Sequence, residues 1–262
     1  MSINSLQDFV LRQMTAPLRL ALEARAPLEH GAMFVAQPLL SMAPKGDGHP
    51  VLVLPLMFGN DLSMLPLRSF IAGRGYAASA WEQGLNLGPR AGVFDGSLAR
   101  LRELRREHGR PVSLVGWSLG GLFARALALA SPDDVRCVIS IATPITSDPS
   151  PEKMWRMYER FTGDSMGLPD HVTGLDQPLS VPATSIFSRS DGIVPWQGSI
   201  ERSGPQSESI EVESSHLGLG VHPLTLYAIA DRLAQPEGQW RPFDRSGLLS
   251  WLYRDPAREG WF

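Results

Sequence analysis

The chain has 262 residues, of which 43% are hydrophobic and 19% are charged. This composition is typical of a soluble globular protein that buries a sizeable core. The formal net charge of −3 provides no basic field to attract nucleic acid, so we expect no nucleic-acid partner. A single cysteine, Cys137, excludes an internal disulfide and a cysteine-cluster metal site.

The first 49 residues predict a helical extension that packs on the core. Their apolar residues recur at helical spacing, and Pro17, Pro27 and Pro38 interrupt the pattern. A helix that lies on a membrane surface or binds a partner is the alternative interpretation. Lysines are scarce and acidic residues are present in this segment, so we expect no stable membrane insertion. Because the first residues lack a basic segment followed by an apolar run, we also expect a cytoplasmic location.

Residues 50–262 predict an α/β domain. Short apolar runs alternate with helical patterns, which indicates a mostly parallel sheet with helices on both faces. The predicted strands cover 51–54, 113–115, 138–141 and 183–187, and the alternating run 209–212 is expected nearer an edge. The predicted helices cover 97–108, 119–130 and 224–234, with Ser97 as the N-cap of the first and Gly109 at its end. The segment 145–181 interrupts this alternation and predicts a small inserted cap.

A candidate nucleophile lies at one strand-to-helix junction. Residues 116–121 read Gly-Trp-Ser-Leu-Gly-Gly, directly after a predicted strand and at the start of a predicted helix. A sharp turn there would raise the Ser118 hydroxyl above the sheet, and flanking glycines would relieve the crowding. The Leu119 amide would lie at a helix N-terminus, where it can stabilise an oxyanion. The alternative is a glycine-rich turn whose serine only caps the helix.

A serine hydroxyl needs a base, and the base needs an acid that orients it. Asp191 follows the strand predicted at 183–187, and His216 follows the one predicted at 209–212. Active sites of parallel sheets lie at the carboxyl ends of strands, so we expect both residues near Ser118. The usual order of serine, acid and histidine excludes His30 and His49.

The remaining histidines are weaker candidates for the base. His108 lies at a helix end and His171 lies in the inserted segment. His222 precedes Pro223 as a capping or packing residue. Asp191 could alternatively belong to a plain Asp-Gly turn.

These three motifs resemble the α/β-hydrolase superfamily, and within it the compact bacterial lipases and esterases. The matching segments are 116–121, 190–195 and 215–219, and the likeness by order of elements covers roughly residues 50–235. The resemblance implies an α/β-hydrolase fold and ester hydrolysis through an acyl-enzyme. It also implies reduced N-terminal strands, because no clear strand precedes residue 51.

The resemblance further implies a second oxyanion donor after the first strand. The family usually has a His-Gly pair there, whereas this chain has Leu-Pro-Leu-Met-Phe-Gly at 54–59. Leu56 stands where glycine is common. We expect the amide of Met57 to be the donor, with Phe58 as the alternative if the turn is shifted.

Substrate contacts are expected from the cap and from the neighbours of these loops. The candidates are Met154, Trp155 and Tyr158 of the cap, together with Phe58 and Trp117. The cap residues could instead pack the insert onto the core, and Trp117 could pack under the turn. The expected substrate is a small-molecule acyl ester, and neither a metal nor an organic cofactor is required.

Alternatives remain within and outside this chemistry. The same triad could serve a thioesterase, an acyltransferase, an amidase or a lactonase. A non-catalytic binding protein with the same fold is possible too, since Leu56 departs from the family pattern. The sequence does not indicate an oligomeric state.

Overall fold

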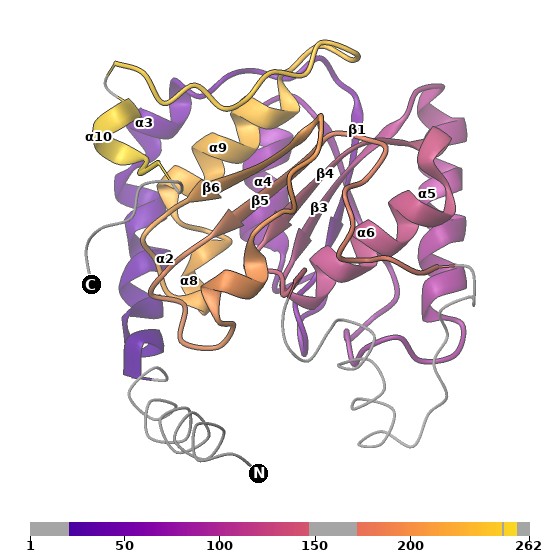
Figure 1. Cartoon of the computed structure of the whole chain (residues 1–262), viewed down its shortest axis with the longest axis horizontal. Coiled ribbons are helices and arrows are strands. Elements are labelled where there is room, and N and C mark those ends of the chain that lie inside the picture. The colour runs from indigo at the N-terminus through magenta and orange to yellow at the C-terminus, as the bar shows by residue number, and fades with distance from the viewer. Residues whose placement is uncertain (1–20, 147–171, 248, 256–262) are drawn as a thin grey trace.

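A computed structural model describes residues 21–146, 172–247 and 249–255. A six-stranded, fully parallel sheet lies at the centre, with the strand order β2-β1-β3-β4-β5-β6. The strands are β1 (Pro50–Leu54), β2 (Ala77–Ala80), β3 (Val112–Trp117), β4 (Val135–Ile141), β5 (Ala183–Phe187) and β6 (Ser207–Glu211). The predicted parallel sheet is confirmed, and β6 occupies an edge as its alternating pattern indicated (Figure 1).

Helices cover both faces of this sheet (Figure 1). One core contains side chains of α3 (Gln37–Ser41), α4 (Leu65–Gly73) and α9 (Pro223–Leu233). The other contains side chains of α5 (Val93–His108) and α6 (Leu119–Ala130). Neighbouring residues of one strand enter opposite cores, as Val53 and Leu52 do, because side chains alternate along a strand. Strands buried on both faces therefore appear as continuous apolar runs.

The remaining elements are short, apart from α2. They are η1 (Leu22–Arg25), α2 (Ala26–Val35), η2 (Pro132–Asp134), η3 (Trp196–Ser199), α8 (His216–Leu219) and α10 (Leu249–Leu252). In the N-terminal segment, Met33 of α2 and Leu40 of α3 are buried in the first core. The start of α2 packs against α8 instead, beside the turn that carries His216.

Two features of the sheet and its helices differ from the sequence-based expectation. Helix α5 begins at Val93 after Gly92, so the prediction of Ser97 as its N-cap is wrong. Ser97 lies one turn inside the helix, where its hydroxyl donates to the Val93 carbonyl at 2.8 Å. Strand β2 was not predicted, because its sequence of three alanines and one serine has weak β-propensity. Backbone pairing with β1 stabilises this strand although its own β-propensity is weak.

Arg125 anchors the segment that returns from the inserted region. It lies on α6 without exposed surface, and its guanidinium donates to the carbonyls of Leu175 and Gln177, both at 2.6 Å. It also pairs with the buried carboxylate of Glu201 at 2.5 Å. A buried charge requires such full pairing, so Arg125 fixes where the chain rejoins the sheet before β5.

A buried polar chain lies at the opposite end of the sheet from the predicted site. His49 has no exposed surface; its Nδ1 lies 2.6 Å from Asp47 Oδ1 and its Nε2 lies 2.9 Å from Ser113 Oγ. Burial lowers the pKa of His49 to about 4, although the hydrogen bond with Asp47 opposes this. His49 is therefore mostly neutral in the folded protein above about pH 4.

We predict that His49 makes the protein less stable as the pH falls from about 6.5 to about 4. The unfolded chain takes up a proton on His49 near its ordinary pKa of 6.5, whereas the folded protein does not. The full difference between those pKa values corresponds to about 3 kcal/mol of unfolding free energy. Urea unfolding from pH 7 to pH 4 should show a shallower pH dependence in His49→Gln than in the wild type. Parallel curves would contradict the assignment.

Candidate active site

The backbone at Ser118 is held in an unusual conformation between β3 and α6. Its φ of 53° and ψ of −116° lie outside the common regions for a residue with a side chain. The Ser118 amide donates to the Ile141 carbonyl at 2.6 Å, which fixes the turn against the end of β4. The hydroxyl makes no capping hydrogen bond to α6. This geometry favours the interpretation as a nucleophile turn over that of a helix cap.

Glycines permit the close packing around this turn. A Cβ at Gly116 would lie 2.3 Å from the carbonyl oxygen of Gly120, and a Cβ at Gly120 would lie 2.3 Å from that of Leu54. Both contacts are with backbone, which cannot swing away as a side chain can. The first turn of α6 therefore lies directly on the ends of β1 and β3 only because these positions carry no side chain.

Asp191 and His216 are hydrogen bonded to each other. Asp191 Oδ2 lies 2.7 Å from His216 Nδ1, and both side chains are almost fully buried. Asp191 Oδ1 accepts the amides of Ile193 and Val194, at 2.8 and 2.7 Å. Because a carboxylate only accepts, Nδ1 of His216 carries the proton, which leaves Nε2 as an acceptor. One carboxylate thus shapes its own turn and orients the imidazole.

The turns after β5 and β6 are tied together at their bases by Ser188. Its hydroxyl donates to the Ser214 carbonyl at 2.6 Å and accepts the Ser214 amide at 3.1 Å. The two turns follow adjacent strands, because β5 and β6 pair in register. Asp191 and His216, which are 25 residues apart in the sequence, are therefore neighbours at the carboxyl ends of these strands.

Trp117 connects the nucleophile turn to the histidine turn. Its indole Nε1 donates to the His216 carbonyl at 3.2 Å. The side chain is only 4% exposed, and a Cβ at Gly220 would lie 2.3 Å from its ring. This position favours packing under the turn over contact with a substrate. It also brings the residue before Ser118 within hydrogen-bonding distance of the residue predicted to be the base.

The structure distinguishes between the two candidate oxyanion donors in the loop after β1. Phe58 has a φ of 60°, and its amide is already used, since it donates to the Asn86 carbonyl at 2.8 Å. Among the described residues, no acceptor engages the amide of Met57 or that of Leu119. The geometry therefore favours Met57 over Phe58 as the donor that accompanies Leu119.

Asn86 holds this loop and was missed from the sequence. It has no exposed surface; its Nδ2 donates to the Pro55 carbonyl at 2.6 Å and its amide donates to the Gly59 carbonyl at 2.8 Å. Its Oδ1 accepts the Gly88 amide at 3.1 Å. Nothing in a polar loop 31 residues away signals this role, because the contact depends on how α4 and β2 return the chain.

The structure describes His222 but not the predicted substrate-binding residues of the cap. His222 is the N-cap of α9, where its Nδ1 accepts the Leu224 amide at 3.3 Å, as the capping interpretation indicated. Met154, Trp155 and Tyr158, and with them most of the predicted cap, lie outside the described residues. In the described part of the chain, no cluster of His, Cys, Asp and Glu could hold a metal ion. No described helix is both long and apolar enough to cross a membrane.

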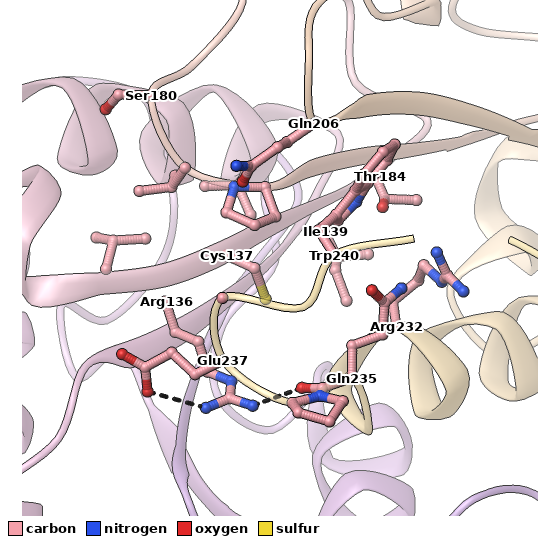
Figure 2. A pocket seen from close by; sticks show the side chains of 16 residues that line it. Arg136, Cys137, Ile139, Ser180, Thr184, Gln206, Arg232, Gln235, Glu237 and Trp240 are labelled. Carbon is pink, nitrogen blue, oxygen red and sulfur yellow. Dashed lines mark hydrogen bonds and ion pairs between the residues drawn. The ribbon is translucent and has the colours of Figure 1, made fainter. Parts of the chain in front are cut away.

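A separate cavity of about 190 Å³ lies at the amino ends of β4 and β5, away from Ser118. Figure 2 shows Cys137 and Trp240 in its lining, with Arg136 bonded to Glu237 and Gln235. Burial raises the pKa of the Cys137 thiol, so this sulfur is a poor nucleophile. The cavity contributes nothing to the turns described above.

Comparison with known proteins supports the fold. The family described as "alpha/beta hydrolase fold" matches residues 98–167, and no curated protein matches the chain. The structure is similar to a putative non-heme bromoperoxidase of Mycobacterium tuberculosis (17% identity, 72% of this chain and 92% of that one, TM-score 0.50). It is also similar to a monoacylglycerol lipase of Paleococcus ferrophilus (16% identity, 70% and 96%, TM-score 0.50). A third similar structure is lipase B of Aspergillus fumigatus (16% identity, 74% and 54%, TM-score 0.50).

The parallel sheet, the strained strand-to-helix turn and these similarities all indicate the same fold. The chain has the α/β-hydrolase fold and resembles the proteins of that superfamily.

Proposed function

We propose that the protein is a serine hydrolase that cleaves carboxylic esters, with Ser118 as nucleophile, His216 as base and Asp191 as the orienting acid. The observation that carries this proposal is the 2.7 Å hydrogen bond between Asp191 and His216 Nδ1. It leaves Nε2 as the acceptor for a hydroxyl proton. The strained Ser118 backbone, at the carboxyl end of β3 in the same sheet, supplies the hydroxyl.

The reaction proceeds in two halves. Ser118 Oγ bonds to the acyl carbon while its proton passes to His216 Nε2, and the carbonyl oxygen becomes an oxyanion. The amides of Leu119 and Met57 donate to that oxyanion. Collapse of the intermediate breaks the bond to the alcohol oxygen, which takes the proton from His216. Water then repeats the sequence on the acyl-enzyme and releases the acid.

An apolar acyl group is supported by the surface around these turns. Phe58, Ile193 and Leu217 each adjoin or nearly adjoin a proposed catalytic residue, and all three are exposed, Phe58 by 69%. Exposed apolar side chains on the loops around a polar centre are typical of sites for apolar ligands. Two of the similar structures are named as lipases, which agrees with the choice of ester over amide.

We predict that a fluorophosphonate probe modifies Ser118 and that the protein hydrolyses p-nitrophenyl esters. Ser118→Ala should lose both properties, with kcat lower by about 10⁴-fold or more, and should keep its thermal midpoint. Intact-mass spectrometry and an ester series from acetate to palmitate measure this. Turnover retained in purified Ser118→Ala would refute the nucleophile. Labelling without ester turnover would redirect the proposal to thioester or acyl-transfer chemistry, and no labelling would favour a binding protein.

We also predict that Asn86→Ala lowers kcat by about 100-fold, because a displaced oxyanion donor costs about that much. The substitution removes the donor to the Pro55 carbonyl and the acceptor for the Gly88 amide. Asn60→Ala is the matched control, since Asn60 caps an exposed turn of the same loop through the amides of Leu62 and Ser63. Steady-state kinetics should show kcat nearly unchanged in the control. Equal effects in both variants would contradict a specific role for Asn86.

A further inference from the structure

We infer that the N-terminal extension positions the catalytic acid and base, and that Glu23 is its positioning residue. This inference rests on the proposed function of Asp191 and His216. The contacts come from η1 and the first turn of α2, which lie beside α8 (Figure 1). They reach the turns after β5 and β6 and the first residues of α8.

One carboxylate connects the two turns. Glu23 Oε1 accepts the amide of Gly192 at 2.9 Å and the amide of His216 at 2.8 Å. Glu23 Oε2 accepts the amide of Leu217 at 2.9 Å. Gly192 directly follows Asp191, so the same side chain holds the backbone of the acid turn and that of the histidine itself.

Two further charged residues of the same segment bind these turns. Arg25 donates to the carbonyl of Ser190 at 3.3 Å and to its hydroxyl. Glu29 accepts the Ser215 amide at 3.0 Å and the Ser215 hydroxyl. Arg25 and Glu29 also pair with each other at 3.1 Å. The residues next to Asp191 on both sides, and those next to His216 on both sides, are therefore held by one short segment.

Side chains join the two turns through the hydrogen bond between Asp191 and His216 and through those of Ser190 to Glu213 and to the Ser214 carbonyl. None of these contacts involves the backbone amides at the tips of the turns. Ser188 joins the turns only at their bases. The amides of His216 and Leu217 begin α8, and the first amides of a helix have no partner within it. Water could satisfy those amides but could not fix their direction. Hydrogen bonds from amides to a carboxylate are shorter and stronger than neutral ones, so Glu23 can hold the His216 backbone in place.

A purely structural role is the competing explanation, and substitution at Glu23 separates the two. Glu23→Ala removes all three acceptors and should lower kcat by about 10- to 100-fold with little change in KM, because small misplacements of a catalytic group have effects of this size. Glu23→Gln keeps one oxygen for the amides of Gly192 and His216. It should therefore recover most of the lost kcat.

Glu208→Ala is the matched control. Glu208 is also a hydrogen-bonded carboxylate, which accepts from Arg232 at 2.6 Å and from the Phe243 amide at 2.7 Å, but it lies on the remote part of β6. This variant should lose at least as much thermal stability as Glu23→Ala while its kcat is unchanged. If Glu23→Ala lowers the thermal midpoint but leaves kcat unchanged, the inference is overturned.

A spectroscopic measurement tests positioning without any substrate. The proton between His216 Nδ1 and Asp191 should give a far-downfield proton NMR signal, assigned by its absence in His216→Asn. Glu23→Ala should broaden or shift that signal, and Glu208→Ala should leave it in place. An unchanged signal in Glu23→Ala would also overturn the inference. If the wild type is not labelled by fluorophosphonate, the proposed function fails, but this signal still decides whether Glu23 orders the two turns.

A second variant covers the case in which Glu23→Ala does not fold. Arg25→Ala leaves Glu23 in place and removes the donors to Ser190 and the ion pairs with Glu29 and Glu213. It should show a smaller decrease in kcat with the same broadened signal. Wild-type kcat and an unchanged signal in Arg25→Ala would then count against the inference.

Discussion

The close approach of the first turn of α6 to the ends of β1 and β3 is the constraint on which the site depends. The carbonyls of Leu54 and Gly120 lie where a side chain at Gly120 or Gly116 would collide with them. The chain can enter α6 from β3 only through a sharp turn, and Ser118 takes the strained backbone of that turn. Such strain persists when the surrounding structure determines it fully. Here the hydrogen bond from the Ser118 amide to Ile141 and the close packing at Gly116 and Gly120 hold the strained backbone in place.

The parallel sheet then brings the other groups together at the carboxyl ends of its strands. Every parallel strand ends there, so the turns after β1, β5 and β6 converge without any sequence proximity. Each turn is closed by a buried polar side chain with its own partners: Asn86 for the first, Asp191 for the second and Ser188 between the second and third. Buried polar groups cost stability unless they are paired, so these networks have few alternative arrangements.

The sequence predicted the parts of this arrangement that have a local signal. Buried strands appear as apolar runs, and Ser118 directly follows one, while Asp191 and His216 lie a few residues beyond the ends of β5 and β6. Asn86 and Glu23 have no such signal, since their partners are backbone groups brought close only by the folded chain. Strand β2 was missed for a related reason, because its alanines pair through β1 and not through their own propensity. The start of α5 was misplaced because a serine inside a helix can bond to a carbonyl four residues earlier, as Ser97 does.

The polar character of the contacts made by η1 and α2 has a physical consequence. Hydrophobic burial is non-directional, and a helix held only by apolar contacts can shift along its axis at little cost. Ala26 and Met33 of α2 are buried, but Leu28, near the start of the helix, is 78% exposed, so apolar contacts hold only part of this helix. A carboxylate that receives three amides from two turns fixes both distance and direction. The start of this helix and the turns that carry Asp191 and His216 therefore share the same hydrogen bonds.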